Sequence, residues 1–589
     1  MHNTITTRAQ LMDALRLAAE LEHNLMCQYL FAVYSMRRYP YERFNPYTFE
    51  EILTPAELER IRRWQMKITL IARQEMEHLG LALNLLSSIG GTPSFSRPNM
   101  PQKIGYYGPA DIEMTLTPGN LDTIKRFQNF ESPYRLEENF CGIEPDPEHV
   151  INQPCAEKWC SQAQTVGRDE MLGALQRPGR LLGAAPHIDL LYGIGFADVQ
   201  ELYETIARGF ETLTQTLGAG KLFIGDPGNQ IYGGPPSPLY GSMNDLNQYG
   251  LSLIAVTDLA SAQQAIRMII EQGEGVPARA DYLTNTHFCL FTEIRQGMEA
   301  DGGRLAEVCA RPVMKNPMTV IQPDVTAPEE VNLITDEQTR LVAELSSQSY
   351  EVMLLLLLYL YSDQMKNPDQ TNALMDAAFF PFMTMFVRPL AEILTELPAK
   401  KEWEQQVERG EPYRTAGPGF ELAGDVVLFP NLPQTWDLFQ ERIDALVTKF
   451  RRVTARRPLP PPAGTLAGVD PIQPRWGWAP LNDPWLNLPT QKAFGVDAPE
   501  EFRAIYQQRI ELWNKIKNES TEIAPEELEA SLQFPGQSSF APAAVTPAFD
   551  ERGVPPPSLP WLRLYYLRQN MERISFDWKT NWMQIGRVS

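Results

Sequence analysis

Three residues of this sequence combine metal-binding side chains with positions on predicted apolar helix faces. Glu75 and His78 stand three apart in "IARQEMEHLGLALNLL" (71–86), and Glu22 lies on the apolar stripe of an earlier predicted helix. A buried ionised carboxylate without a partner is costly, and a divalent cation removes that cost for several carboxylates at once. Residues i and i+3 of a helix point the same way, as in the Glu-x-x-His pairs of carboxylate-bridged di-iron bundles. The pattern predicts a metal site.

Two further residues extend this constellation. His287 falls on the stripe of a predicted helix over 281–298, and Tyr29 lies two turns after Glu22 on the same face. We expect the Tyr29 hydroxyl to hold a ligand or a bridging oxygen in place. The ordinary alternatives are a hydrogen-bonded core histidine at 287 and a solvated Glu-x-x-His pair. A metal site is favoured over these alternatives because two different helices each place a glutamate, Glu22 and Glu75, on an apolar stripe. His23 lies off the stripe, so we expect it at the surface or in a helix cap.

The helices that carry these residues have clear start signals. Thr7 is followed by Gln10, and Thr54 by a proline and Glu57, the spacing of two capping boxes. Both helices then repeat apolar residues every three or four positions, which is the period of a bundle seam, and the second ends at Gly90. The sequence therefore predicts two long, paired bundle helices.

The rest of the chain divides by composition into three predicted regions. Residues 1–300 are expected to form the bundle, with a long loop region that contains short helices at 92–195, a second long loop at 218–250 and a third bundle helix over 198–217. Asp258 is the expected N-cap of a further bundle helix. Residues 301–425 add helices over 336–362 and 372–397, the second kinked at two prolines. Residues 426–589 are rich in proline and tryptophan. Because disordered tails are poor in aromatic residues, we expect an ordered arm packed over the bundle, with helices only near 499–518 and at "APEELEAS".

Composition excludes several classes of protein. The 589 residues include 52 lysines and arginines against 73 aspartates and glutamates, a net charge of −21. Binding to nucleic-acid phosphates needs a cationic surface, so we expect no nucleic-acid partner. The longest apolar run, 352–361, is about half a membrane span, which favours a buried core helix and no membrane partner.

The six cysteines contain no CxxC pair. So few cysteines predict a reducing compartment without a disulfide framework. The N-terminal stretch has no basic segment followed by an apolar one, so no secretory signal is visible. The expected location is the cytoplasm.

Blocks of the sequence resemble a known family. "AAELEHNLMCQYLFAVYSM", "EMEHLGLALNLLSSIGGTP", "ELYETIARGFETL", "LFIGDP", "VTDLASAQQAIRMIIEQGEG" and "THFCLFTEI" are similar to the ferritin-like domain of the iminophenyl-pyruvate dimer synthases, of the violacein and rebeccamycin pathway type. The resemblance runs in order from about residue 7 to about residue 300, continues more loosely to about 422, and does not cover the C-terminal region. It implies a mainly α fold, a ferritin-like four-helix bundle with long loop insertions.

The resemblance also implies a ligand set. The metal ligands would be Glu22, Glu75, His78, Glu204 of the third helix and His287. A symmetric site would carry a glutamate three residues before His287, where this sequence has Thr284. Either Glu271 or Glu274 supplies the missing carboxylate, or the site holds one metal ion, or a second ion is loosely held.

Mixed histidine and carboxylate ligation suits iron, or manganese, better than structural zinc. We therefore expect a non-haem iron oxidoreductase, with one or two iron ions, that uses O2 on an amino-acid-derived small molecule of secondary metabolism. By resemblance, the reaction would be oxidative coupling of an imine or enamine. The alternatives are a non-catalytic ferritin-like metal-binding or scaffold protein, and a metal-independent synthase using His78 and Glu75 as acid and base. The long loops favour an enzyme. A homodimer would cover the aromatic C-terminal surface.

Overall fold

A computed structural model describes most of the first 456 residues and one C-terminal helix. The described residues are 4–38, 42, 51–103, 107, 113–131, 199–232, 236–237, 241–242, 253–274, 286–362, 374–375, 377–403, 406, 412–429, 434–456 and 559–583. The loop predicted at 92–195 is thus described only in part. Thr284 and the helices predicted at "APEELEAS" and 499–518 lie outside the described residues.

Two long antiparallel helices, α1 (Arg8–Ser35) and α2 (Pro55–Ser88), form the centre of the fold. Both predicted capping boxes are confirmed, with Thr7 and Thr54 as N-caps. Gly90 follows α2 at a φ of 85°, a conformation that glycine adopts without steric cost. The side chain of Gln65 in α2 donates to the Met36 carbonyl just after α1, which fixes the start of α2 against the end of α1.

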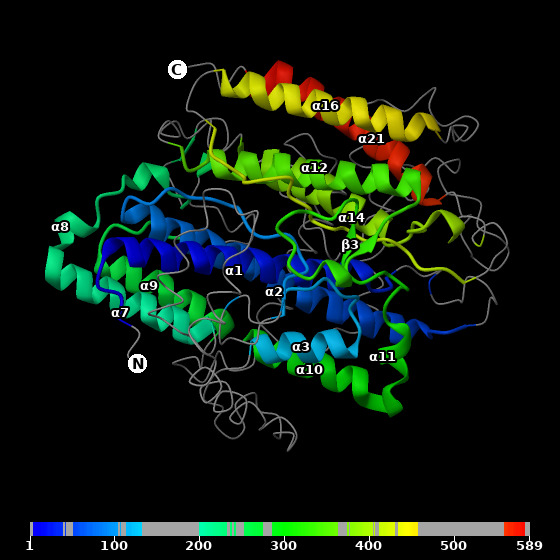
Figure 1. The fold of residues 1–589 in the computed structure, drawn as a ribbon, viewed down its shortest axis with the longest axis horizontal. Helices are drawn as coiled ribbons and strands as arrows, with labels where there is room; N and C mark the ends of the chain where they lie inside the picture. Colours follow the sequence, from blue (N-terminus) through cyan, green and yellow to red (C-terminus); the bar gives the residue numbers. More distant parts are fainter. Residues whose placement is uncertain are drawn as a thin grey trace.

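Two shorter pairs of helices lie end to end along this central pair. At the α1 N-terminal end lie α7 (Val199–Leu217) and α9 (Leu259–Ile269), with Asp258 as the confirmed N-cap of α9. Near the other end lie α3 (Leu121–Phe130) and α10 (His287–Glu299), as Figure 1 shows. A π-helical turn, η4 (Ile270–Glu274), continues α9. The C-terminal ends of α3 and η4 and the N-terminal ends of α7 and α10 therefore meet at the middle of α1 and α2.

A further layer of helices covers the opposite side of α1. It begins with α12 (Glu337–Tyr359), followed by the π-helix η8 (Ala378–Val387), which contains Pro381, and by α14 (Arg388–Leu394). Of the described helices, α12 alone is long and apolar enough to cross a membrane, and 72% of its most apolar window is buried in the protein. The expectation of a core helix at 352–361 is confirmed, since all but one of these residues are buried.

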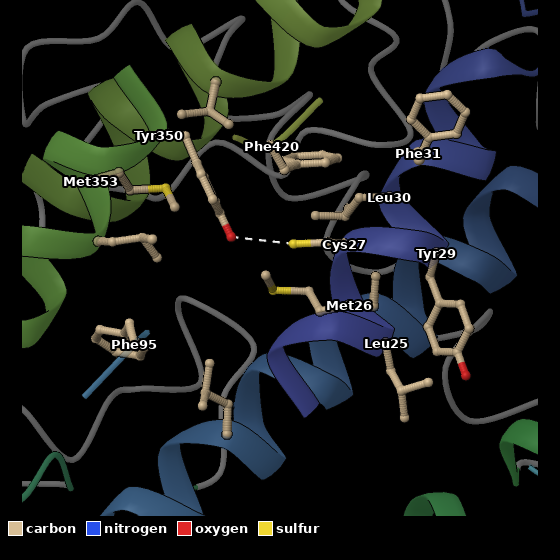
Figure 2. Close-up of a cluster of buried hydrophobic side chains, with 14 of the residues drawn as sticks. Leu25, Met26, Cys27, Tyr29, Leu30, Phe31, Phe95, Tyr350, Met353 and Phe420 are labelled. Carbon is tan, nitrogen blue, oxygen red and sulfur yellow. Dashed lines mark hydrogen bonds between the residues drawn. The ribbon is translucent and has the colours of Figure 1, made fainter. Parts of the chain in front are cut away.

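Figure 2 shows the contact between α1 and α12, where Tyr350 reaches between apolar side chains toward Cys27. The Tyr350 hydroxyl lies 3.3 Å from Cys27 Sγ and also hydrogen-bonds His23 Nε2. His23 is fully buried, so its predicted surface position is wrong. The reason is that α1 is covered on both sides, and the face that carries His23 and Cys27 packs on α12. Tyr29 points away from this contact.

Two C-terminal helices were missed by the sequence-based prediction. They are α16 (Thr435–Arg456) and α21 (Leu559–Asp577), which is continued by the π-helical turn η9 (Trp578–Trp582). The two helices pack side by side, α16 on α12 and α21 on α14 and η8 (Figure 1). The Trp578 ring is fully buried, stacks on Trp436 at 5.3 Å, and donates from Nε1 to the Trp436 carbonyl. The described part of the tryptophan-rich region is thus ordered and packed.

The remaining elements are short. They are α8 (Ala219–Leu222), η2 (Pro227–Asn229), β1 (Pro236–Ser237), β2 (Gly241–Ser242), η6 (Ala300–Gly303), α11 (Arg304–Val308), β3 (Pro317–Met318), η7 (Pro328–Glu330) and β4 (Asn332–Leu333). The strands pair as two ladders, β1 with β2 antiparallel and β3 with β4 parallel.

The described cysteines differ in state. Cys27 and Cys309 are free and buried. Cys289 is disulfide-bonded. The expectation of a chain without disulfides therefore does not hold at Cys289.

Candidate metal site

The first half of the site comes from the middle of α1 and α2. Glu22, Glu75 and His78 all have completely buried side chains. His78 Nδ1 lies 3.2 Å from Glu75 Oε2 and 3.7 Å from Glu22 Oε2. One ligand atom from each residue lies within 4.8 Å of the other two, a spacing that can hold a metal ion. The grouping expected from the helical stripes is the one that the structure brings together.

The second half of the site shares Glu75 with the first. His287 Nδ1 lies 3.0 Å from Glu75 Oε1 and 3.3 Å from Glu131 Oε2, and ligand atoms of the three residues again lie within 4.8 Å of one another. The rings of His78 and His287 stack with centroids 5.5 Å apart. Glu75 thus turns one oxygen toward each histidine. This arrangement offers two adjacent positions for metal ions with Glu75 between them.

Burial and mutual charge set the protonation of the cluster. Burial, followed by the charge of Glu75, raises the pKa of Glu22 to about 8. Burial also raises the pKa of Glu131. For Glu75, burial acts in the raising direction, but the charge of His287 and hydrogen bonds from both histidines lower its pKa overall. Burial likewise acts to lower the pKa of His287, yet the charges of Glu131 and Glu75 raise it to about 9. The cluster without metal therefore holds protons at neutral pH.

One carboxylate oxygen in the cluster indicates what this hydrogen-bond network lacks. Glu22 Oε2 is buried and has no hydrogen-bond partner among the described residues, since His78 Nδ1 lies 3.7 Å away. A buried, unsatisfied carboxylate oxygen is unfavourable, and a cation between the carboxylates would satisfy it. The donor set of three carboxylates and two imidazoles suits iron or manganese. The residues present therefore fit a metal centre.

Each outer carboxylate is also held by a tyrosine. Tyr203 of α7 donates to Glu22 Oε1 across 2.5 Å, and Tyr29 of α1 donates to Glu131 Oε1. Both tyrosine side chains are fully buried. The structure thus places the Tyr29 hydroxyl on a carboxylate whose other oxygen faces His287, and the role expected of Tyr29 stays a prediction.

Not all predicted ligands join the cluster. Glu204 lies on the exposed face of α7, where it accepts from Gln200 and lies 3.6 Å from Arg208. The reason is that Tyr203, one position earlier, occupies the inward stripe. As a correction to the implied ligand set, α7 contributes Tyr203 and not Glu204.

Glu271 and Glu274 are the two expected replacements for a glutamate at position 284. Glu271 is half-buried in η4 and belongs to neither group of ligand atoms. Glu274 ends the same turn. The helix predicted over 281–298 begins only at His287, with Thr286 as an N-cap in extended conformation. Among the described residues, the predicted helix is therefore confirmed only from His287 onward.

Glu131 is the carboxylate of this cluster that the sequence analysis did not single out. It is the C-cap of α3, a ten-residue helix inside the region predicted as a long loop. The signal was present, because Ile124, Phe127 and Glu131 follow the spacing i, i+3 and i+7 of one helix face. The Glu131 carboxylate lies beside His287, with Oε2 3.3 Å from Nδ1.

Comparison with known proteins shows what the chain is similar to. Residues 15–296 match the model of the family described as Ferritin-like. The chain is 25% identical over 421 residues to a Chromobacterium violaceum protein named 2-imino-3-(indol-3-yl)propanoate dimerase, covering 70% of this chain and 34% of that protein. It is 28% identical over 277 residues to a Lentzea aerocolonigenes protein named dichlorochromopyrrolate synthase, covering 44% of this chain and 25% of that protein.

The chain thus spans about a third or less of the length of these two relatives. A solved structure, a ferritin-like protein from Caulobacter vibrioides, aligns with 64% of this chain and 96% of its own at 15% identity and a TM-score of 0.32. The family match and the resemblance seen in the sequence blocks cover the same part of the chain: residues 15–296 form a ferritin-like domain.

Proposed function

We propose that this protein is a non-haem iron oxidoreductase with a two-ion site, acting on an amino-acid-derived small molecule of secondary metabolism. The observation that carries the proposal is that Glu75 belongs to both groups of possible ligand atoms. Its two oxygens face His78 and His287, and a further carboxylate stands beside each histidine. A scaffold role alone does not require five buried ionisable groups to converge with a carboxylate oxygen, Glu22 Oε2, left unsatisfied among the described residues.

The substrate class rests on the relatives. The name of the C. violaceum protein describes an enzyme that joins two molecules of an indolyl imino acid. Joining two such molecules as enamines through a carbon–carbon bond releases two protons and two electrons, which reduce one O2 to H2O2. Iron bound at the site would supply the redox centre for this electron transfer.

The residues around the ions have separable roles. Glu22, Glu131 and the shared Glu75 would neutralise the metal charge, and His78 and His287 would complete the ligand set. Tyr203 and Tyr29 orient the outer carboxylates by donating to one oxygen of each, which leaves the other oxygen facing the cluster. The burial of all five groups excludes bulk water from the ligand atoms.

The first test is elemental analysis of protein purified without chelator. The wild type should contain close to two iron ions per chain, and the Glu75→Ala/His78→Ala variant should contain almost none. Glu271→Ala is the matched control, because Glu271 lies in the adjoining turn but outside both ligand groups. If neither protein holds a transition metal, even after anaerobic Fe(II) loading, the cluster is a hydrogen-bonded network and the metal-independent synthase becomes the better hypothesis.

The second test addresses the reaction. An aryl imino acid formed in situ from the matching amino acid is added to iron-loaded protein, and O2 uptake and the mass of a coupled product are followed. Product without O2 uptake would contradict an oxidase. The cytoplasmic location and the homodimer remain predictions, to be checked by cell fractionation and by light scattering of the purified protein.

A further inference from the structure

We infer that Gln74 and Gln272 are positioning residues that hold His287 and His78 with Nδ1 directed at the carboxylates. This inference rests on the proposed metal site and adds the groups that orient its histidines. His78 Nε2 lies 3.1 Å from Gln272 Oε1, and His287 Nε2 lies 3.2 Å from Gln74 Oε1. The two histidines, from different helices, are therefore held in the same way.

The chemistry of the glutamine side chain determines which atom is the donor and which the acceptor in each contact. An amide oxygen only accepts hydrogen bonds, so the Nε2 that faces it must carry the proton. In a neutral imidazole the other nitrogen, Nδ1, then has a free lone pair, and that nitrogen faces the carboxylates in both rings. A hydrogen bond to the remote nitrogen fixes the tautomer and the ring orientation of a ligating histidine.

The orientation of the Gln272 amide is itself fixed. Gln272 Nε2 donates to Glu77 Oε1 at 2.9 Å, and Glu77 is almost fully buried. A carboxylate only accepts, so the amide nitrogen turns to Glu77 and the amide oxygen to His78. The chain from Glu77 through Gln272 to His78 thus has one hydrogen-bond direction. Glu77, which the sequence places off the apolar stripe, acquires a role through this contact.

The π-helical turn η4 brings Gln272 to this position. A Cβ atom at Gly273 would lie 3.0 Å from His78 Cε1 and 3.1 Å from His287 Nδ1, tighter than ordinary contact. Only glycine lets the backbone of this turn lie against both rings without displacing them. Single π-helical turns often occur at functional sites. Here the turn places the amide of Gln272 at the edge of the first ring.

The test compares matched substitutions in the full chain loaded with Zn(II), a diamagnetic probe. Gln272→Leu and Gln74→Leu remove the acceptor, and Gln74→Glu keeps one at the same place. Gln264→Leu on the exposed face of α9 is the control. Loss of such a partner typically lowers metal affinity about 10- to 100-fold, and we expect this for each leucine variant but not for Gln74→Glu or Gln264→Leu. Thermal unfolding of the metal-free proteins checks that each variant folds.

A second readout separates positioning from general destabilisation. In histidine side-chain 15N NMR of the Zn(II)-loaded wild type, two rings should show metal-bound Nδ1 and protonated Nε2. The signals are assigned with His78→Ala and His287→Ala. Zn(II) bound through Nε2, or leucine variants that bind Zn(II) like the wild type, would overturn the inference alone. A wild type that binds neither Zn(II) nor iron would overturn the proposed function as well, so the two failures are distinguishable.

Discussion

Tyr203 Oη donates to Glu22 Oε1 across 2.5 Å and so joins the start of α7 to the middle of α1. Tyr29 forms the equivalent bond to Glu131 on the other side of the cluster. The two outer carboxylates therefore each accept from a phenol, while the shared Glu75 lies against His78 through Oε2 and against His287 through Oε1. These two hydrogen bonds restrict the side-chain conformations of Glu22 and Glu131 before any ion binds.

Tyr203→Phe should weaken metal binding without unfolding the domain. The ring remains to fill its buried position, but Glu22 loses its donor and the metal-facing geometry of its carboxylate. Loss of a hydrogen-bond partner of a ligand typically costs about 10-fold or more in metal affinity. Competition with a chelator, using Co(II) as the probe, measures the change. Tyr232→Phe, at a half-buried tyrosine that takes no part in the cluster, should match the wild type.

Glu204→Gln should leave metal content unchanged. The Glu204 side chain is about half exposed and faces Arg208 on the outer surface of α7. Surface ion pairs of this kind contribute little to stability, so the melting temperature should also change little. Elemental analysis of the variant beside the wild type decides the point. A variant that lost iron would mean that α7 turns Glu204 inward in the metal-bound protein.

The predictable part of the site lies on long, regular helices. Glu22, Glu75 and His78 follow apolar stripes of α1 and α2, so their direction could be read from spacing alone. The stripe of α7 also indicated Tyr203, whereas resemblance to the family favoured Glu204. In α7, the spacing of apolar residues predicted correctly that Tyr203 points inward.

The parts that were missed lie at helix ends and in regions with unusual composition. Glu131 caps a short helix, where periodicity extends over less than three turns and proline and glycine flank it. The helix α16 has a regular stripe, including Trp436, Phe439, Ile443 and Phe450, that was hidden by the proline-rich segments after it. Contacts such as those of Gln74 and Gln272 with the histidines depend on tertiary structure and leave no pattern in the sequence.

Metal affinity should rise with pH. Without metal, Glu22 has a pKa of about 8 and His287 of about 9, so both are protonated at pH 7. A metal ion must displace these protons, and the affinity therefore increases as pH rises toward 9, by up to about tenfold per unit for each proton displaced. Competition of Co(II) between the protein and a chelator at pH 6, 7 and 8 measures the slope, after correction for the protonation of the chelator. A pH-independent affinity would mean that the ligands are already deprotonated.

Glu131→Ala and Glu22→Ala should each remove one of two metal ions, whereas Glu75→Ala should remove both. Each outer carboxylate belongs to one group of ligand atoms, and Glu75 belongs to both groups. Elemental analysis gives the count. The absorption spectrum of Co(II)-loaded protein reports whether the remaining ion keeps its ligand field. If Glu131→Ala retained the wild-type count and spectrum, the site would hold its metal through Glu22, Glu75 and His78 alone. In that case, Glu131 and His287 would form only a buried ion pair beside it.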